Sequence, residues 1–177
     1  MHTNLFKSFC YIDTFENTLI NKLSKATSVI YRNYKKKLDI NEIIKIKETC
    51  KKKGIKFYLS NHIKLAIKLN LDGAYIPSFN KKFNFKSYNF KQEFKLLGSA
   101  HNLKEIRFKE LQNVNYIFIS PLFSSQKNKR GLGIYKFKNL MKKTNKKVIC
   151  LGGITNKDLK KIKSLECNGF ASISFFK

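Results

Sequence analysis

Residues 95–119, KLLGSAHNLKEIRFKELQNVNYIFI, decide the fold, because they hold a helix-like segment between two short apolar runs. The runs KLLG (95–98) and YIFI (116–119) have the length of strands, and Leu103–Leu111 between them has the length of a short helix. A strand, a helix and a second strand in this order predict a right-handed unit in which the two strands are parallel.

Six further runs of strand length repeat this order along the 177 residues. Most are apolar on both faces, as buried parallel strands are. They comprise residues 9–12, 28–31, 56–59, 73–76, 148–151 and 170–173. Helix-like stretches lie between the runs, and the clearest is Ile40–Lys53, which Gly54 is suited to end. The others comprise residues 64–70, 137–143 and 158–165.

Eight strands that alternate with helices predict an α/β fold, a (β/α)8 TIM barrel. The chain is shorter than the roughly 200–250 residues usual for this barrel. We therefore expect a compact form with a short first helix and a truncated last helix, since the sequence ends four residues after FASI (170–173). An open doubly wound sheet is the alternative. With 42% hydrophobic residues, residues 1–177 are expected to form a single domain.

The net charge of +26 would favour a polyanionic partner, but the kind and placement of the basic residues argue against nucleic acid. Only three of the 37 basic residues are arginines, and the lysines lie along the whole chain instead of in one block. Nucleic-acid-binding proteins rely on arginine for bidentate contacts. We therefore do not expect nucleic acid as a partner.

The cysteines and the hydropathy of the chain point to a protein without disulfides and without a membrane segment. The four cysteines form no C-x-x-C pair, which favours free thiols over disulfides or a zinc site. No stretch approaches the roughly 20 apolar residues of a membrane helix, and the N-terminal stretch lacks the apolar run of a signal peptide. We expect a cytoplasmic protein.

Polar residues or glycines follow each expected strand. In a barrel these positions meet at one face, where active sites are built. They are Asp13, Arg32, Asn61, His62, Ser78, Ser99, His101, Ser120, Ser125, Lys127, Gly152, Gly153 and Ser174. Each one alone could simply end a strand or cap a helix, but their shared placement favours a site.

The stretch LGGITNKD (151–158) carries the most specific signal for a ligand. Its two glycines allow backbone N–H groups to approach an anion, and Thr155 with Asp158 predicts a capping box that opens a helix. Barrels often bind phosphate with the loops after strands seven and eight. The expected phosphate cup comprises Gly152, Gly153 and the backbone near Ile173 and Ser174. A tight turn into a capped helix is the alternative.

One of the three histidines, His101, is the best candidate for a general acid or base, because histidine titrates near neutral pH. The alternative is an N-terminal residue of a surface helix. His62 stands one turn before an amphipathic helix and could simply face solvent.

Four stretches together resemble the thiamine phosphate synthase/TenI family. They are GSAHN (98–102), SPLFSSQKNKRGLG (120–133), CLGGIT (150–155) and NGFASISFF (168–176). Members of this family are (β/α)8 barrels. They either join a pyrimidine diphosphate to a thiazole phosphate or convert a thiazole phosphate carboxylate into its aromatic tautomer. The resemblance implies a small phosphorylated thiazole or pyrimidine ligand.

The resemblance also assigns roles to individual residues. The thiazole phosphate would be held by Gly152, Gly153, Ser174 and the backbone of Ile173. The diphosphate or pyrimidine would lie near Arg32, Ser125 and either Lys127 or Lys129. The expected catalytic residues are Ser99 and His101, with His101 as the proton-transfer residue of the tautomerase branch.

Two departures from the family pattern bear on the reaction. Asn61 and Asn80 stand where the synthases have aspartates that support Mg²⁺, a cation that prefers carboxylate oxygens. This favours a TenI-type thiazole tautomerase, which needs no cofactor. A divergent synthase that retains Mg²⁺ and a non-catalytic phosphate-ligand binder or regulator are the alternatives. A truncated last helix would expose an apolar flank, which favours a homo-oligomer.

Overall fold

The chain folds into a closed barrel of eight parallel strands in sequential order, with the last strand paired to the first. The computed structural model describes residues 6–124 and 130–177. The strands are β1 (Lys7–Ile12), β2 (Thr27–Tyr31), β3 (Phe57–Ser60), β4 (Gly73–Ile76), β5 (Lys95–Ala100), β6 (Tyr116–Ile119), β7 (Lys147–Leu151) and β8 (Gly169–Ser172). This confirms the TIM barrel and excludes the open doubly wound sheet.

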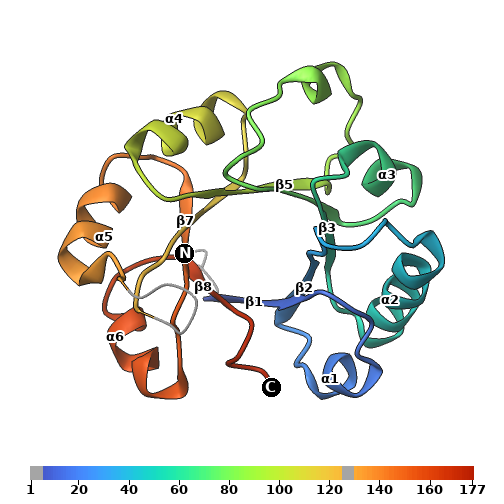
Figure 1. Ribbon diagram of the computed structural model, residues 1–177, viewed down its shortest axis with the longest axis horizontal. Coiled ribbons are helices and arrows are strands. Elements are labelled where there is room, and N and C mark those ends of the chain that lie inside the picture. The colour runs from blue at the N-terminus through green and yellow to red at the C-terminus, as the bar shows by residue number, and fades with distance from the viewer. Residues whose placement is uncertain (1–5, 125–129) are drawn as a thin grey trace.

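Helices surround the barrel on its outer face (Figure 1). They are α1 (Asn17–Lys22), α2 (Ile40–Lys53), α3 (Ile63–Lys68), α4 (Leu103–Leu111), α5 (Gly133–Met141) and α6 (Leu159–Lys163), with short 3-10 helices η1 (Asn84–Ser87) and η2 (Asn156–Asp158). In α2 the Asp39 side chain accepts hydrogen bonds from the N–H groups of Asn41 and Glu42, and Gly54 ends the helix with φ of 67°.

The first and last connections are short, as expected. Helix α1 has six residues. After β8 the described chain makes a turn at Phe175 and Phe176, whose rings pack on Phe170 of β8 with centroids 4.8 and 6.0 Å away. Aromatic rings therefore stand where a last helix would cover the strand.

The core has two layers because successive strand residues point to opposite faces of the sheet. In β1, Phe9 and Tyr11 point into the barrel, whereas Cys10 and Ile12 belong to the layer between strands and helices. The rings of Tyr11 and Tyr75 meet edge to face inside the barrel, 5.6 Å apart. This packed interior forms the floor beneath the carboxyl ends of the strands.

The described cysteines are free and buried, as the sequence predicts. No helix in residues 6–124 and 130–177 is long and apolar enough to cross a membrane.

Candidate functional site

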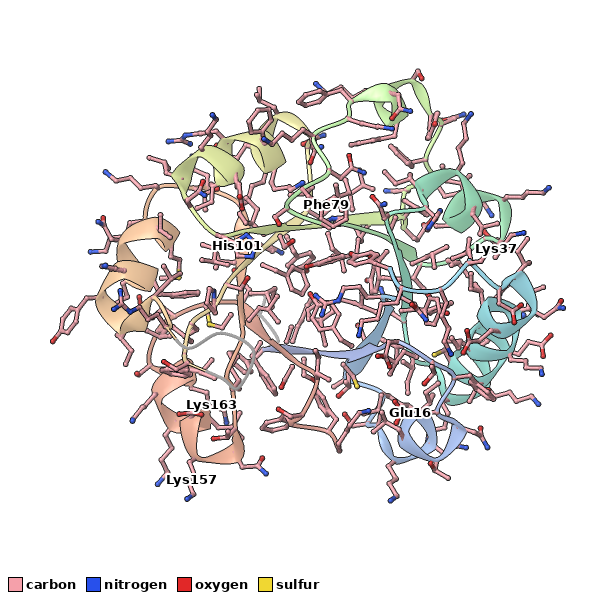
Figure 2. All side chains as sticks on the ribbon, in the orientation of Figure 1. Glu16, Lys37, Phe79, His101, Lys157 and Lys163 are labelled. Carbon is pink, nitrogen blue, oxygen red and sulfur yellow. The ribbon has the colours of Figure 1, made fainter. Side chains whose placement is uncertain are left out.

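A cavity of about 220 Å³ opens at the carboxyl ends of the strands. Its polar lining comprises Arg32, Ser78, Ser99, His101 and Ser120. Its apolar and aromatic lining comprises Tyr34, Tyr75, Pro77, Phe79 and Leu151. These residues come from loops and strand ends around the barrel; Phe79 and His101, which follow β4 and β5 in the chain, are labelled in Figure 2. Concave sites with a few converging polar groups are typical of ligand binding, and this volume suits one small ring.

His101 is held by a carboxylate from the first turn of α4. Its Nδ1 lies 2.9 Å from Glu105 Oε2, and its backbone N–H donates to the same oxygen at 2.7 Å. Asn102 caps the helix by accepting a hydrogen bond from the Glu105 N–H at 3.0 Å. A proton on Nδ1 would donate to Glu105, which leaves Nε2 to exchange a proton with a ligand. The His101 side chain is 48% exposed, so the ring is accessible from the cavity and from solvent.

Arg32 places a cation in the same cavity. Its guanidinium lies over the Tyr11 ring, 4.8 Å from the centroid. Within the described residues, Arg32 forms no ion pair with a carboxylate. A guanidinium that is stacked on a ring but has no counter-ion is suited to bind a phosphate or carboxylate group of a ligand.

Two aromatic residues form the rim of the cavity. The Tyr34 and Phe79 rings meet edge to face with centroids 5.4 Å apart, and both remain partly exposed. The Tyr34 hydroxyl lies 2.6 Å from Ser60 Oγ at the end of β3, which fixes the ring. Deeper in the cavity, burial raises the pKa of the Tyr75 phenol, so this hydroxyl stays protonated. The rim therefore offers a rigid aromatic surface for a heterocycle.

The glycines after β7 allow two loops to meet at the edge of the cavity. Gly152 and Gly153 have φ of 98° and 65°. A Cβ atom on Gly153 would lie 2.5 Å from the carbonyl oxygen of Phe123, so only glycine fits against the loop after β6. The expected capping box is present, with the Thr155 N–H donating to Asp158 Oδ2 at 2.9 Å. Since Leu151 lines the cavity, the glycine turn begins at its wall.

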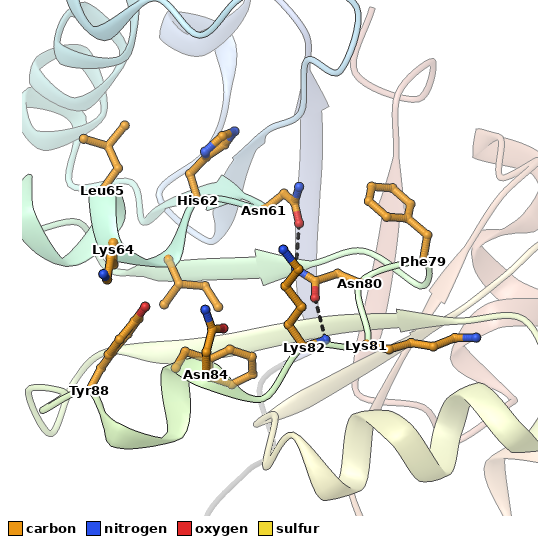
Figure 3. A pocket seen from close by; sticks show the side chains of 12 residues that line it. Asn61, His62, Lys64, Leu65, Phe79, Asn80, Lys81, Lys82, Asn84 and Tyr88 are labelled. Carbon is orange, nitrogen blue, oxygen red and sulfur yellow. Dashed lines mark hydrogen bonds between the residues drawn. The ribbon is translucent and has the colours of Figure 1, made fainter.

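Asn61 and Asn80 are brought into direct contact. Asn80 Nδ2 donates to Asn61 Oδ1 at 2.8 Å, and Asn80 Oδ1 accepts from the Lys82 N–H at 2.9 Å (Figure 3). The pair lines a second cavity of about 520 Å³ that shares Phe79 with the first. Burial lowers the pKa of His62 in the wall of this second cavity.

The asparagine pair does not fit the Mg²⁺ site that the family resemblance implies. Mg²⁺ demands hard oxygen ligands in octahedral geometry and is usually bound by carboxylates. Here each amide oxygen already accepts a hydrogen bond and neither residue carries a charge. No group of three or more His, Cys, Asp or Glu side chains suited to a metal is found in the described part of the chain.

The structure gathers some of the expected site residues and separates others. Arg32, Ser99 and His101 line one cavity. Gly152 and Gly153 directly follow Leu151, which lines this cavity, whereas Ile173 and Ser174 lie exposed in the turn after β8. The Ser172 hydroxyl lies 3.4 Å from the Ile154 carbonyl oxygen and links the loops after β7 and β8. Ser125, Lys127 and Lys129 lie outside the described residues.

Sequence reasoning missed Glu105 and the aromatic rim. An Asn-x-x-Glu capping pattern directly after His101 could have identified Glu105, because a capping glutamate reaches back to the residues before its helix. Phe79 carried no such signal, since an exposed phenylalanine in a loop has no spacing rule.

The family model described as thiamine monophosphate synthase matches residues 9–176. A thiamine-phosphate synthase of Lactococcus lactis subsp. cremoris (strain MG1363) is 25% identical over 148 residues, which cover 82% of this chain and 67% of that protein. A putative thiamine-phosphate synthase 2 of Aquifex aeolicus (strain VF5) is 27% identical over 177 residues, covering 94% of this chain and 91% of that protein.

Other relatives are longer, and the chain spans 44% of the length of a 28% identical thiamine-phosphate synthase from Prochlorococcus marinus (strain AS9601). Among solved structures, a thiamine phosphate pyrophosphorylase from Pyrococcus furiosus superposes with a TM-score of 0.78 at 15% identity. That alignment covers 97% of this chain and 86% of the other, and it supports the same fold.

Proposed function

Because the chain belongs to the thiamine monophosphate synthase family, we propose that it acts in thiamine biosynthesis as a TenI-type thiazole tautomerase. The substrate is a thiazole phosphate carboxylate and the product is its aromatic tautomer. A tautomerisation takes a proton from one carbon of a conjugated system and returns a proton to another carbon. The net charge is unchanged, so the reaction requires a positioned acid–base group and no redox partner.

The His101–Glu105 pair is the observation that carries this proposal. Glu105 accepts from Nδ1 and stabilises the imidazolium that forms when Nε2 takes a proton. The neutral ring and the imidazolium alternate during one turnover, so a single histidine removes one proton and delivers the other. Ser99, which is 5% exposed and lines the same cavity, is positioned to donate a hydrogen bond to the substrate.

Arg32 and the glycine turn supply the anion contacts. The substrate carries a phosphate and a carboxylate, and Arg32 is the cation of the 220 Å³ cavity. We place the phosphate at Gly152 and Gly153, with Ser174 in the turn after β8 as a further contact, and the carboxylate towards Arg32. Tyr34 and Phe79 then cover one face of the thiazole ring.

A divergent thiamine-phosphate synthase is the second candidate, favoured by the names of the curated relatives. Such an enzyme would stabilise a departing diphosphate with cations. The Asn61–Asn80 pair does not support Mg²⁺, so this reaction would depend on side chains such as Arg32 and Lys127. The third candidate is a phosphate-ligand binder without turnover.

The two enzymes are separated by an assay for thiamine phosphate with pyrimidine diphosphate, thiazole phosphate and Mg²⁺, run with and without EDTA. We expect no thiamine phosphate in either case, together with measurable binding of thiazole phosphate by calorimetry. Formation of thiamine phosphate that EDTA abolishes would make the chain a synthase. Binding of thiazole phosphate without thiamine phosphate formation and without tautomerisation would favour the third candidate, the phosphate-ligand binder.

A further inference from the structure

Lys109 on α4 is a lysine with no access to solvent, and its ammonium group is directed at a loop of the site. The side chain is 0% exposed. Its Nζ donates to the carbonyl oxygens of Pro77 and Asn80, each at 2.9 Å, and to Gln112 Oε1 at 2.8 Å. All three donor positions of the ammonium group are therefore satisfied.

Gln112 doubles the contact with the same loop. Its Nε2 donates to the Asn80 carbonyl oxygen at 3.0 Å and to the Lys82 carbonyl oxygen at 2.9 Å. Together, Lys109 of α4 and Gln112 at its C-cap bind three backbone carbonyls of residues 77–82. We call these two side chains and their four hydrogen bonds to the loop the α4 clamp.

The barrel makes room for the lysine stem at Gly98. A Cβ atom at this position of β5 would lie 2.8 Å from Lys109 Cδ and 3.0 Å from Val114 Cγ1. Real Cβ atoms do not approach so closely, so a larger residue would displace the stem. The path from α4 to the loop is therefore built by two elements, the helix and the strand before it.

Burial of an ammonium group is costly unless its hydrogen bonds are satisfied, and a simple apolar side chain would fill the same space at lower cost. In the described part of the chain, Lys109 makes no ion pair within 4 Å. The Glu105 carboxylate, one turn earlier on α4, opposes the lowering of the Lys109 pKa by burial, and it also holds His101. Helix α4 therefore carries both Glu105, which contacts His101, and Lys109, which contacts the loop of residues 77–82.

The loop held by the α4 clamp carries much of the site. Pro77, Ser78 and Phe79 line the 220 Å³ cavity, and Asn80 binds Asn61. We propose that Lys109, with Gln112, is a positioning residue that fixes residues 77–82 from inside the protein. The loop then has its binding conformation without a divalent cation bound to its outer side. The effect of this loop on substrate binding rests on the proposed function, whereas the fixed conformation of residues 77–82 does not.

Hydrogen exchange in EDTA tests the α4 clamp without any ligand. Lys109→Met removes the ammonium group and keeps an unbranched apolar stem, and Lys104→Met on the exposed side of the same helix is the matched control. We expect the backbone amides of residues 78–82 to exchange at least tenfold faster in Lys109→Met, with α2 unchanged and Lys104→Met like wild type. Unchanged exchange in residues 78–82 of folded Lys109→Met would overturn the proposal.

Gln112→Leu keeps the test decisive if Lys109→Met does not fold. It keeps Lys109 and its bonds to Pro77 and Asn80, but it removes the Gln112 Oε1 acceptor of Lys109 and the two bonds from Gln112 to Asn80 and Lys82. Exchange in residues 78–82 is again expected to rise, and wild-type exchange in this variant would contradict the α4 clamp.

The effect on the site is read from turnover of thiazole phosphate carboxylate in EDTA. We expect Lys109→Met to raise KM about tenfold and to leave kcat within about threefold, because the loop positions the ring while His101 remains in place. A loss of kcat with unchanged KM would overturn the positioning role. If wild type shows no turnover, the proposed function fails, and the exchange experiment still decides the α4 clamp.

Discussion

Asn80 donates its side-chain amide to Asn61 Oδ1 at 2.8 Å and thereby joins the loop after β4 to the end of β3. Asn61 adopts φ of 64°, a left-handed conformation that asparagine tolerates better than most residues. Two neutral amides here make a hydrogen bond, whereas two carboxylates at this separation would repel and require a cation between them. The pair therefore makes a neutral junction between the end of β3 and the loop after β4.

Substituting both residues with aspartate tests this relationship. In EDTA, Asn61→Asp/Asn80→Asp loses the amide bond and gains repulsion, so we expect the free energy of unfolding to fall by about 1–3 kcal/mol. Saturating Mg²⁺ should restore part of the loss, and wild type should show no Mg²⁺ effect. Thermal unfolding with and without Mg²⁺ measures both, and a wild type stabilised by Mg²⁺ would contradict the neutral junction.

Glu105 is expected to matter for turnover more than for binding. Glu105→Gln keeps the size of the side chain but removes the charge that stabilises the imidazolium, so kcat should fall about tenfold or more. The dissociation constant of thiazole phosphate should change less than threefold. Glu110→Gln on the same helix, which lies outside the cavity, serves as the control. Equal losses in both variants would show that helix stability, not the histidine contact, is responsible.

Arg32 is expected to hold the anionic part of the ligand. Arg32→Met should weaken binding of thiazole phosphate carboxylate about 10- to 100-fold, the amount expected for loss of one or two charge-assisted hydrogen bonds. Arg107→Met, an exposed arginine on α4, is the matched control and should bind like wild type. Calorimetry at fixed ionic strength measures the affinities, and an unchanged affinity in Arg32→Met would exclude Arg32 from the site.

Lys109 should make stability depend on pH in a defined direction. Burial lowers its pKa to about 8, from 10.5 in the unfolded chain. Below pH 8 Lys109 is protonated in both the folded and the unfolded protein. Between pH 8 and 10.5 only the unfolded chain keeps the proton, so the free energy of unfolding rises with pH. The free energy of unfolding of wild type minus that of Lys109→Met should rise by about 2 kcal/mol from pH 8 to pH 10. Chemical unfolding measures it, and a flat difference would contradict the lowered pKa, because Lys109 would then keep its proton in the folded protein over this range.

The strands and the barrel follow from local patterns, but the contacts within the site do not. Runs such as YIFI and VICL are apolar on both faces, and that pattern alone predicts buried parallel strands. Helix α5 begins at Gly133, four residues before the expected start at Phe137, where the N–H groups of Leu132 and Gly133 donate to the carbonyl oxygens of Pro121 and Leu122. Such long-range contacts have no local signal.

Lys109 shows the same limit at the level of one side chain. In a chain this rich in lysine, a further lysine on an amphipathic helix predicts a solvated position. Only the positions of Gly98 and the loop after β4 show that this one is buried. The Asn61–Asn80 contact likewise has no local signal, because the two residues lie 19 positions apart, and only the family resemblance brings the two positions together.

Metal-independent proton transfer by His101 is tested by following the aromatisation of thiazole phosphate carboxylate in EDTA with proton NMR. We predict turnover by wild type, a loss of about 100- to 10,000-fold in His101→Asn, and wild-type turnover in the control His62→Asn. Thiazole phosphate should bind all three proteins with similar affinity. Absence of aromatisation by wild type, or full activity in His101→Asn, would contradict the account.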